Sequence, residues 1–325
     1  MIRLQTPTPG PSELLVRLSV TGICGTDLGL ASGKLGPTKD ILGHEGVGYV
    51  AQIGSASGSL AQLGDRVAIT WVRDICGVCQ YCLHPGGEVR CKEQLNSGRR
   101  LDGTFAEYAL VPARYVVHLP EHIMVSDEMI APILCAGVTA YTALKSSGGV
   151  GGQWIAVSGS GGGVGALTIK YAKAMGFRVV AIDVGDAKRR ISMECGADHF
   201  IDANSSTSLV EQVDGVTMQR GTSIVLVCAG SGEAYNAVLD IVAPYGTLVC
   251  VGIPPPDHLV SFHPLLLIDR GFKIIGSAVG TRQDLMEAID FVQAGLVKPT
   301  IIVERFTDLP DLLSDFANVS DDDLY

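Results

Sequence analysis

Residues 154–165 read WIAVSGSGGGVG, an apolar run that ends in a glycine-rich turn. The run predicts a buried strand, and the amphipathic stretch Val164–Met175 predicts a helix after the turn. Glycine permits a tight turn and close backbone approach, so a pyrophosphate can rest on the N-terminus of that helix. The spacing G-x-x-G-x-x-G departs from the usual G-x-G-x-x-G. The glycines expected to bind the cofactor are Gly159, Gly162, Gly163 and Gly165.

A carboxylate at the end of the next apolar run supports nucleotide binding. Asp183 ends the run Val179–Asp183, where an acid accepts hydrogen bonds from the adenosine ribose hydroxyls. Because an acid there repels a 2′-phosphate, we expect NAD rather than NADP. The alternative is an ordinary acid at a strand end. Lys188 can reach the same ribose, or it is a solvated helix residue.

Strand-like and helix-like runs continue beyond this unit and predict an α/β protein with a doubly wound parallel sheet of the Rossmann type. Those runs are Asp186–Cys195, Ile224–Val227, Thr247–Val251 and Lys273–Gly276. The first third differs, because short β-like runs such as Leu14–Val20 and Gly46–Ile53 alternate there with glycine-rich turns. We therefore expect a second, mostly β domain before the nucleotide domain.

Four cysteines close together predict a structural zinc site. They are separated by two, two and eight residues, and they are Cys76, Cys79, Cys82 and Cys91. A loop that offers four thiolates at short spacing can surround a tetrahedral zinc ion and exclude substrate from it. The alternative is four ordinary cysteines in a loop, although cysteine is usually a buried residue.

Three further residues are candidates for a second zinc ion of different character. Cys24, His44 and Cys135 are far apart in the sequence, so only a folded domain could bring them together. Three protein ligands leave the fourth position of a tetrahedral zinc open for chemistry. We therefore expect two zinc ions per chain.

Composition limits the partners. The 325 residues carry 34 acids against 24 bases, a formal net charge of −10, and no basic patch is visible. Such a chain repels phosphate backbones, so we expect no nucleic acid partner. No apolar run approaches the roughly 20 residues that span a bilayer, and the N-terminus lacks the apolar core of a signal peptide. We expect a cytoplasmic protein, where nine cysteines serve as metal ligands and core residues.

Four short motifs resemble one known family. They are Cys24–Asp27 (CGTD), Gly43–Gly48 (GHEGVG), Cys135–Tyr141 (CAGVTAY) and Lys170–Gly176 (KYAKAMG). The chain resembles the zinc-containing alcohol dehydrogenases of the medium-chain dehydrogenase/reductase family, and the last two motifs are closest to the yeast-type branch. The resemblance implies a GroES-like catalytic domain at 1–132, an NAD-binding domain at 133–286 and a return to the catalytic domain at 287–325. It also implies a homodimer or homotetramer.

The family pattern implies catalytic roles for residues beside the ligands. Zinc acts as a Lewis acid on an alcohol or carbonyl oxygen, and NAD exchanges the hydride. Thr26 resembles the hydroxyl that passes the alcohol proton, with a buried Thr bonded to backbone as the alternative. Asp27 would hold the second ring nitrogen of His44, unless it is a surface acid. Glu45 would lie near the metal, whether or not it coordinates it.

Three further residues match family positions less specifically. Thr139 matches a contact to nicotinamide and Arg282 a pyrophosphate-binding arginine, although each could be a plain helix or loop residue. Trp71 resembles an aromatic wall of the substrate pocket, although a large aromatic side chain often belongs to a core.

Departures from the family pattern bear on the substrate. Gly29 stands where yeast-type enzymes carry the outer histidine of the proton relay, so the proton must leave by another route. Gly25 replaces a residue that is often basic and contacts the cofactor. Ala31 and Leu35 fall where small-alcohol enzymes carry tryptophans, which predicts a pocket roomier than one for ethanol. The substrate is then a primary or secondary alcohol. The alternatives are a polyol or specialised-metabolite dehydrogenase, or an inactive zinc-ribbon interaction protein.

Both ends of the chain look shorter than the family pattern. Relatives carry a β-hairpin before the segment that matches Arg3–Leu15, and a strand after the helix that matches Leu309–Ala317. This sequence ends at Asn318–Tyr325, with an acidic run at Ser320–Asp323 that we expect to fray. Unpaired strand edges would lower stability.

Overall fold

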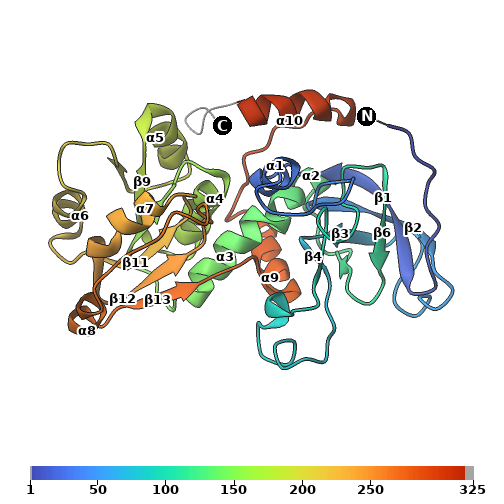
Figure 1. The fold of residues 1–325 in the computed structure, drawn as a ribbon, viewed down its shortest axis with the longest axis horizontal. Helices are drawn as coiled ribbons and strands as arrows, with labels where there is room; N and C mark the ends of the chain where they lie inside the picture. Colours follow the sequence, from blue (N-terminus) through green and yellow to red (C-terminus); the bar gives the residue numbers. More distant parts are fainter. Residues whose placement is uncertain (1, 319–325) are drawn as a thin grey trace. The chain divides into compact units, whose positions relative to one another are not determined.

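A computed structural model describes residues 2–318 (Figure 1). They form two compact units, one made of residues 2–138 and 279–318, the other of residues 139–278. The chain passes from the first unit to the second between residues 138 and 139 and returns between residues 278 and 279. The boundaries expected from the sequence are 132/133 and 286/287. The expected loss of a final strand and the acidic run at Ser320–Asp323 lie outside the described residues.

The second unit contains the predicted parallel sheet. Its strands are β8 (Trp154–Ser158), β9 (Arg178–Asp183), β10 (His199–Asp202), β11 (Thr222–Val227), β12 (Val242–Cys250) and β13 (Lys273–Gly276). Every neighbouring pair is parallel, in the order β10-β9-β8-β11-β12-β13. This is the order 3-2-1-4-5-6 of the doubly wound dinucleotide-binding fold, so the predicted fold class is confirmed.

Helices alternate with these strands. They are α3 (Ala136–Ser146), α4 (Gly163–Ala174), α5 (Gly185–Glu194), α6 (Leu209–Thr217), α7 (Gly232–Ala237), η3 (Leu239–Ile241) and α8 (Leu265–Arg270). Helix α4 packs on β8 and β9, and α5 packs on β9 and β10. All five residues of β8 are buried, as expected for a central strand covered on both faces. The glycine-rich turn therefore lies at the carboxyl end of the central strand.

The first unit is mostly antiparallel β-structure, as expected. Its sheet has the order β6-β1-β2-β3-β7, with β1 (Glu13–Thr21), β2 (Gly46–Ile53), β3 (Arg66–Ile69), β6 (Tyr108–Pro112) and β7 (Val117–His118). A two-stranded ribbon of β4 (Val72–Asp74) and β5 (Leu95–Asn96) carries the cysteine-rich loop. The sheet core is built from alternating apolar residues such as Leu14, Val16, Val50, Val67 and Val111.

Short helices complete the first unit. They are α1 (Gly25–Ala31), η1 (Glu88–Arg90), α2 (Asp127–Ile130), η2 (Ala131–Leu134), α9 (Arg282–Gln293), η4 (Phe306–Asp308) and α10 (Leu309–Asn318). Within residues 2–318 no single helix is long and apolar enough to cross a membrane. The segments Asp127–Leu134 and Ala136–Ser146 are together long and apolar enough to cross a membrane, but they are bent by 54° relative to each other.

Candidate active site and metal centres

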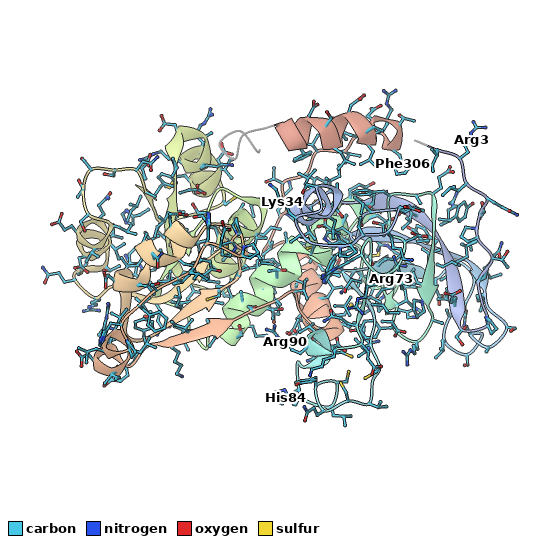
Figure 2. The ribbon with its side chains drawn as sticks, in the orientation of Figure 1. Arg3, Lys34, Arg73, His84, Arg90 and Phe306 are labelled. Atoms are coloured by element: carbon cyan, nitrogen blue, oxygen red, sulfur yellow. The ribbon has the colours of Figure 1, made fainter. Side chains whose placement is uncertain are left out.

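The four clustered cysteines converge in the loop between β4 and β5, which we call the knuckle (residues 76–91). Sγ of Cys82 lies 3.8 Å from Sγ of Cys76 and 3.5 Å from Sγ of Cys79, and Sγ of Cys91 lies 3.7 Å from Sγ of Cys76. Figure 2 shows sulfur atoms gathered in this loop near His84. A tetrahedral zinc ion with bonds of about 2.3 Å to sulfur requires sulfur separations of about 3.8 Å, so the donor set fits zinc.

The knuckle thiols differ in acidity. Backbone N–H groups of Val78 and Cys79 donate to Cys76 and lower its pKa to about 7. Removal from solvent and the neighbouring thiols raise the pKa of Cys82 to about 12. A metal ion displaces thiol protons when it binds, and this costs less at Cys76 than at Cys82 because the pKa of Cys76 is the lower of the two.

A second group of donors meets elsewhere in the first unit. Cys24 precedes α1, His44 and Glu45 precede β2, and Cys135 stands between η2 and α3. One donor atom of each lies within 4.8 Å of the others, and the sulfurs of Cys24 and Cys135 are 3.9 Å apart. The structure therefore brings together three residues that are far apart in the sequence, and adds the carboxylate of Glu45.

His44 is oriented for metal binding. Its Nδ1 lies 3.0 Å from Oδ1 of Asp27, and the ring is fully buried. Asp27 also accepts hydrogen bonds from the backbone N–H groups of Cys24 and Gly43, each at 3.1 Å. Nε2 of His44 has no hydrogen-bond partner among the described residues, although it is buried. A buried nitrogen held in this way is the atom that a metal-bound histidine offers.

Glu45 is buried beside the same donors. Burial, and then the charge of Cys24, raise its pKa well above the ordinary value for glutamate. Its Oε1 lies 3.8 Å from Nε2 of His44. Gly22 makes room for this side chain, because a Cβ there would lie 2.1 Å from Oε2 of Glu45. This role of Gly22 is not evident from the sequence alone, because a glycine directly after a strand has many uses.

The two sulfurs and the imidazole are coupled electrostatically. A hydrogen bond from Cys135 lowers the pKa of Cys24 well below its ordinary value, and the same bond, with burial, raises the pKa of Cys135. Burial alone would lower the pKa of His44, but its hydrogen bond to Asp27 and the negative charges of Asp27 and Cys24 raise the pKa well above the usual value. The pair of thiols thus holds negative charge beside the histidine, which is the donor chemistry that zinc requires.

Two expected neighbours lie close to this group. Thr26 is in the first turn of α1, partly buried, and its backbone N–H donates to the sulfur of Cys24. Trp71 packs edge-on against His44, with ring centroids 5.5 Å apart. The indole also contacts the apolar cluster of the knuckle, so it is both a neighbour of the site and a core residue.

The glycine-rich turn of the second unit has the geometry of a phosphate cradle. Gly159 has φ +74°, and a Cβ on Gly165 would lie 2.0 Å from the Gly159 carbonyl oxygen, so both positions require glycine. Gly162 caps α4, and Gly163 begins it. A pyrophosphate bound in this turn would therefore lie at the N-terminus of α4.

Asp183 and Lys188 are gathered at the same turn. Oδ2 of Asp183 accepts from the backbone N–H of Gly161 at 2.7 Å, and Oδ1 accepts from that of Val184 at 2.8 Å. Lys188 is buried, and a Cβ on Gly161 would meet its side chain at 2.7 Å. Both residues predicted to face the ribose thus adjoin the glycine-rich turn.

Thr139 and Arg282 are the two remaining residues that are predicted to contact the cofactor. Thr139 is buried on α3. Arg282 begins α9 in the first unit, where its guanidinium lies over the ring of Tyr115 at 4.2 Å and its side chain pairs with Glu88. Contacts of either residue with the cofactor stay predictions.

Comparisons with known proteins point to one family. A family model described as an alcohol dehydrogenase GroES-like domain matches residues 10–121, and one described as a zinc-binding dehydrogenase matches residues 163–294. An alcohol dehydrogenase of Geobacillus stearothermophilus is 39% identical over 316 residues, covering 95% of this chain and 90% of the relative. One of Schizosaccharomyces pombe is 39% identical over 307 residues, covering 94% and 86%. The alcohol dehydrogenase structure from Aeropyrum pernix matches with a TM-score of 0.82 at 28% identity, covering 97% and 92%.

Proposed function

This chain belongs to the zinc-containing alcohol dehydrogenases of the medium-chain dehydrogenase/reductase family, and we propose that it carries out reversible hydride transfer between NAD and a primary or secondary alcohol. The relatives confirm the predicted family, and with it the predicted enzyme class and the cofactors zinc and NAD. Membership of the yeast-type branch stays a prediction.

One observation supports the proposed chemistry above all. Cys24, His44 and Cys135 converge in the fold, with the buried Nε2 of His44 left without a partner among the described residues. A zinc ion held there would supply a Lewis acid for the alcohol or carbonyl oxygen, and NAD would supply the hydride acceptor. Asp27 fixes the histidine ring, and burial around Glu45 excludes bulk water.

The proton is proposed to leave through Thr26. Its place in the first turn of α1, two residues after Cys24, supports this role. Gly29 offers no imidazole for the next step, so a water chain or another side chain must take the proton onward.

A substrate larger than ethanol is proposed from the same helix. Ala31 and Leu35 fall where small-alcohol enzymes carry tryptophans, and the side chain of Leu35 packs against Gly29, since a Cβ on Gly29 would lie 2.8 Å from Cδ1 of Leu35. Ala31, at the end of α1, is small. Turnover of two-carbon alcohols alone, in a panel of alcohols of increasing size, would contradict this proposal.

The remaining proposals concern assembly and location. β13 pairs only with β12 in the described sheet, and Ile274 on it is partly exposed, which supports pairing with a second copy. Analytical ultracentrifugation tests whether a dimer or tetramer forms.

A cytoplasmic location is proposed because none of the nine cysteines forms a disulfide in the described chain.

The proposed function is tested with three cysteine variants. Cys24→Ala should abolish turnover and remove one of two zinc equivalents, while NAD binding persists. Cys79→Ala should chiefly lower thermal stability, because the knuckle zinc contributes folding energy. Cys195→Ala is the control, since this partly buried cysteine at the end of α5 belongs to neither group of donors.

The measurements are zinc content, NADH production and melting temperature for each variant. A wild-type chain with one zinc equivalent and no NAD-dependent turnover would instead support the zinc-ribbon interaction protein. Turnover that survives in Cys24→Ala would refute the assignment of the active site.

A further inference from the structure

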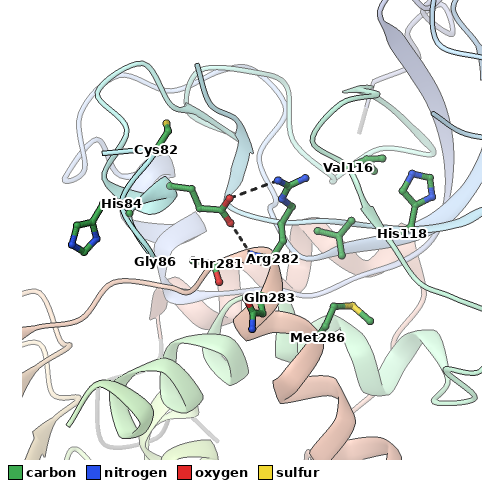
Figure 3. Close-up of a pocket in the computed structure, with 12 residues that line it drawn as sticks. Cys82, His84, Gly86, Val116, His118, Thr281, Arg282, Gln283 and Met286 are labelled. Atoms are coloured by element: carbon green, nitrogen blue, oxygen red, sulfur yellow. Dashed lines mark hydrogen bonds and ion pairs between the residues drawn. The ribbon is translucent and has the colours of Figure 1, made fainter. Parts of the chain in front are cut away.

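Glu88 links the knuckle to a helix that is distant in sequence. It begins η1, between the ligands Cys82 and Cys91, and its side chain is only 16% exposed. Its Oε1 accepts a hydrogen bond from the backbone N–H of Arg282 at 2.8 Å, and its Oε2 lies 3.7 Å from Nη2 of the same residue (Figure 3). The knuckle is thus tied to the first residue of α9.

The N-terminus of α9 makes this bond significant. Thr281 and Asp284 form a capping box, in which the backbone N–H of Asp284 donates to Thr281 at 3.0 Å and that of Thr281 donates to Asp284 at 2.9 Å. The first backbone N–H groups of a helix have no partner within it, and Glu88 supplies one for Arg282. Its negative charge also faces the positive end of the helix dipole.

An apolar contact reinforces the tie. Tyr115 and Cys91 belong to a buried cluster at the base of the knuckle, and Val279 packs against that cluster. The guanidinium of Arg282 lies over Tyr115. Val279 has φ +40°, a conformation that costs energy for a β-branched residue and persists only when its surroundings fix it. The segment before α9 therefore packs against the apolar cluster that contains the knuckle residue Cys91.

The other side of α9 supports a catalytic ligand. The helix buries Leu285 and Ile289 and packs against η2, the turn that delivers Cys135. Leu134, the residue before Cys135, lines the same small cavity as Leu285 and Trp71. Within the first unit, α9 thus contacts the knuckle through its N-terminus and the approach to Cys135 through its buried face.

We propose that Glu88 is a positioning residue that couples the knuckle to the Cys135 ligand through α9. When Glu88 is lost, the start of α9 is released from the knuckle and η2 loses its fixed support, so the geometry at Cys135 relaxes. The effect on turnover rests on the proposed function, but the effect on metal geometry does not.

The test compares three variants with cobalt exchanged into the three-ligand site and zinc left in the knuckle. Glu88→Ala should shift the visible absorption bands of the cobalt and lower kcat by up to about tenfold, the lower end of the effect of removing a direct partner of a metal ligand, because Glu88 acts through α9. Glu88→Gln keeps an oxygen for the Arg282 N–H but loses the charge, so it should fall between wild type and Glu88→Ala.

Glu93→Ala is the matched control. Glu93 is an exposed acid near the same loop, and no ion pair to it is seen among the described residues. The proposal is overturned if Glu88→Ala retains both metals and its cobalt spectrum and kcat equal those of Glu93→Ala. If Glu88→Ala does not hold the knuckle zinc, the same comparison is decided on Glu88→Gln. A wild-type chain without turnover would refute the proposed function, while the cobalt spectra would still decide the role of Glu88.

Discussion

Oδ1 of Asp27 lies 3.0 Å from Nδ1 of His44, and neither side chain is exposed to solvent. Because Nδ1 is occupied by this carboxylate, only Nε2 is available to a ligand. The same carboxylate accepts two backbone N–H groups, so it cannot rotate away without breaking them. The orientation of the imidazole is therefore fixed by the fold before any metal arrives.

Asp27→Asn should weaken zinc binding at the three-ligand site by about 10- to 100-fold, because the amide no longer supports the charge of the metal-bound ring. Competition with a chromogenic chelator measures the affinity. Asp40→Asn, which changes an exposed acid near the same site in sequence, should match wild type. Equal affinity in the two variants would contradict a role for Asp27 in orienting His44.

Gly22→Ala should displace the carboxylate of Glu45, because the added Cβ would lie 2.1 Å from Oε2. Overpacking of this kind costs about 1–3 kcal/mol of stability. Gly25→Ala is the control, since a Cβ there meets nothing within 4 Å. Denaturant unfolding measures the loss. A Gly22→Ala protein as stable as Gly25→Ala would show that Glu45 moves aside freely.

Asp183→Asn should raise the Kd for NADH about tenfold or more, since a hydrogen bond to a charged group contributes about 1.5–3 kcal/mol. Preference over NADPH should fall as well, because the charge that repels a 2′-phosphate is gone. Quenching of protein fluorescence gives both constants. Asp186→Asn, at an almost fully exposed position, should leave them unchanged. Unaltered preference in Asp183→Asn would assign coenzyme choice to another residue.

Asp198 gives the second unit a pH-dependent contribution to stability. Burial opposes its charge, but Lys173 and the backbone N–H of Val179, each 2.7 Å from Oδ2, lower its pKa. A lowered folded pKa means that the stabilisation is present above the unfolded value of about 4 and is lost as pH falls through the folded value.

Asp198→Asn should therefore cost about 1 kcal/mol at pH 7, a value kept small by the partial exposure of the pair, and almost nothing in strong acid. Unfolding in urea at several pH values measures the difference from wild type. Asp257→Asn, at an exposed position, is the control. A cost that persists unchanged in acid would mean that packing, not charge, stabilises this contact.

Much of the candidate site could be predicted because its chemistry is rare. Thiolates and an imidazole at distinctive positions, with a glycine-rich turn before a helix, have few other uses, and Cys24, His44 and Gly159 were recognised on that ground. Glu88 and Gly22 were not, because their roles depend on atoms brought near by folding, at Arg282 and Glu45. A carboxylate or a glycine alone carries no such signal.

The strands can likewise be divided into those that the sequence predicts and those that it does not. Long apolar strands such as β8 and β2 follow from composition and periodicity, and their positions were predicted closely. β10 (His199–Asp202) was missed because four residues with two apolar members resemble a loop until a neighbouring strand pairs with them. The extended start of β12 was missed because Pro244 and Gly246 interrupt its pattern.

The contrast in chain spacing between the two groups of donors has a consequence for biogenesis. The knuckle sulfurs lie within a single loop, so a nascent chain can capture its first ion as soon as Cys91 emerges. The other ion needs Cys135 and a finished fold around His44, so it must enter later. Cells starved of zinc would then accumulate a folded but inactive half-loaded form, which restored metal could activate without new synthesis.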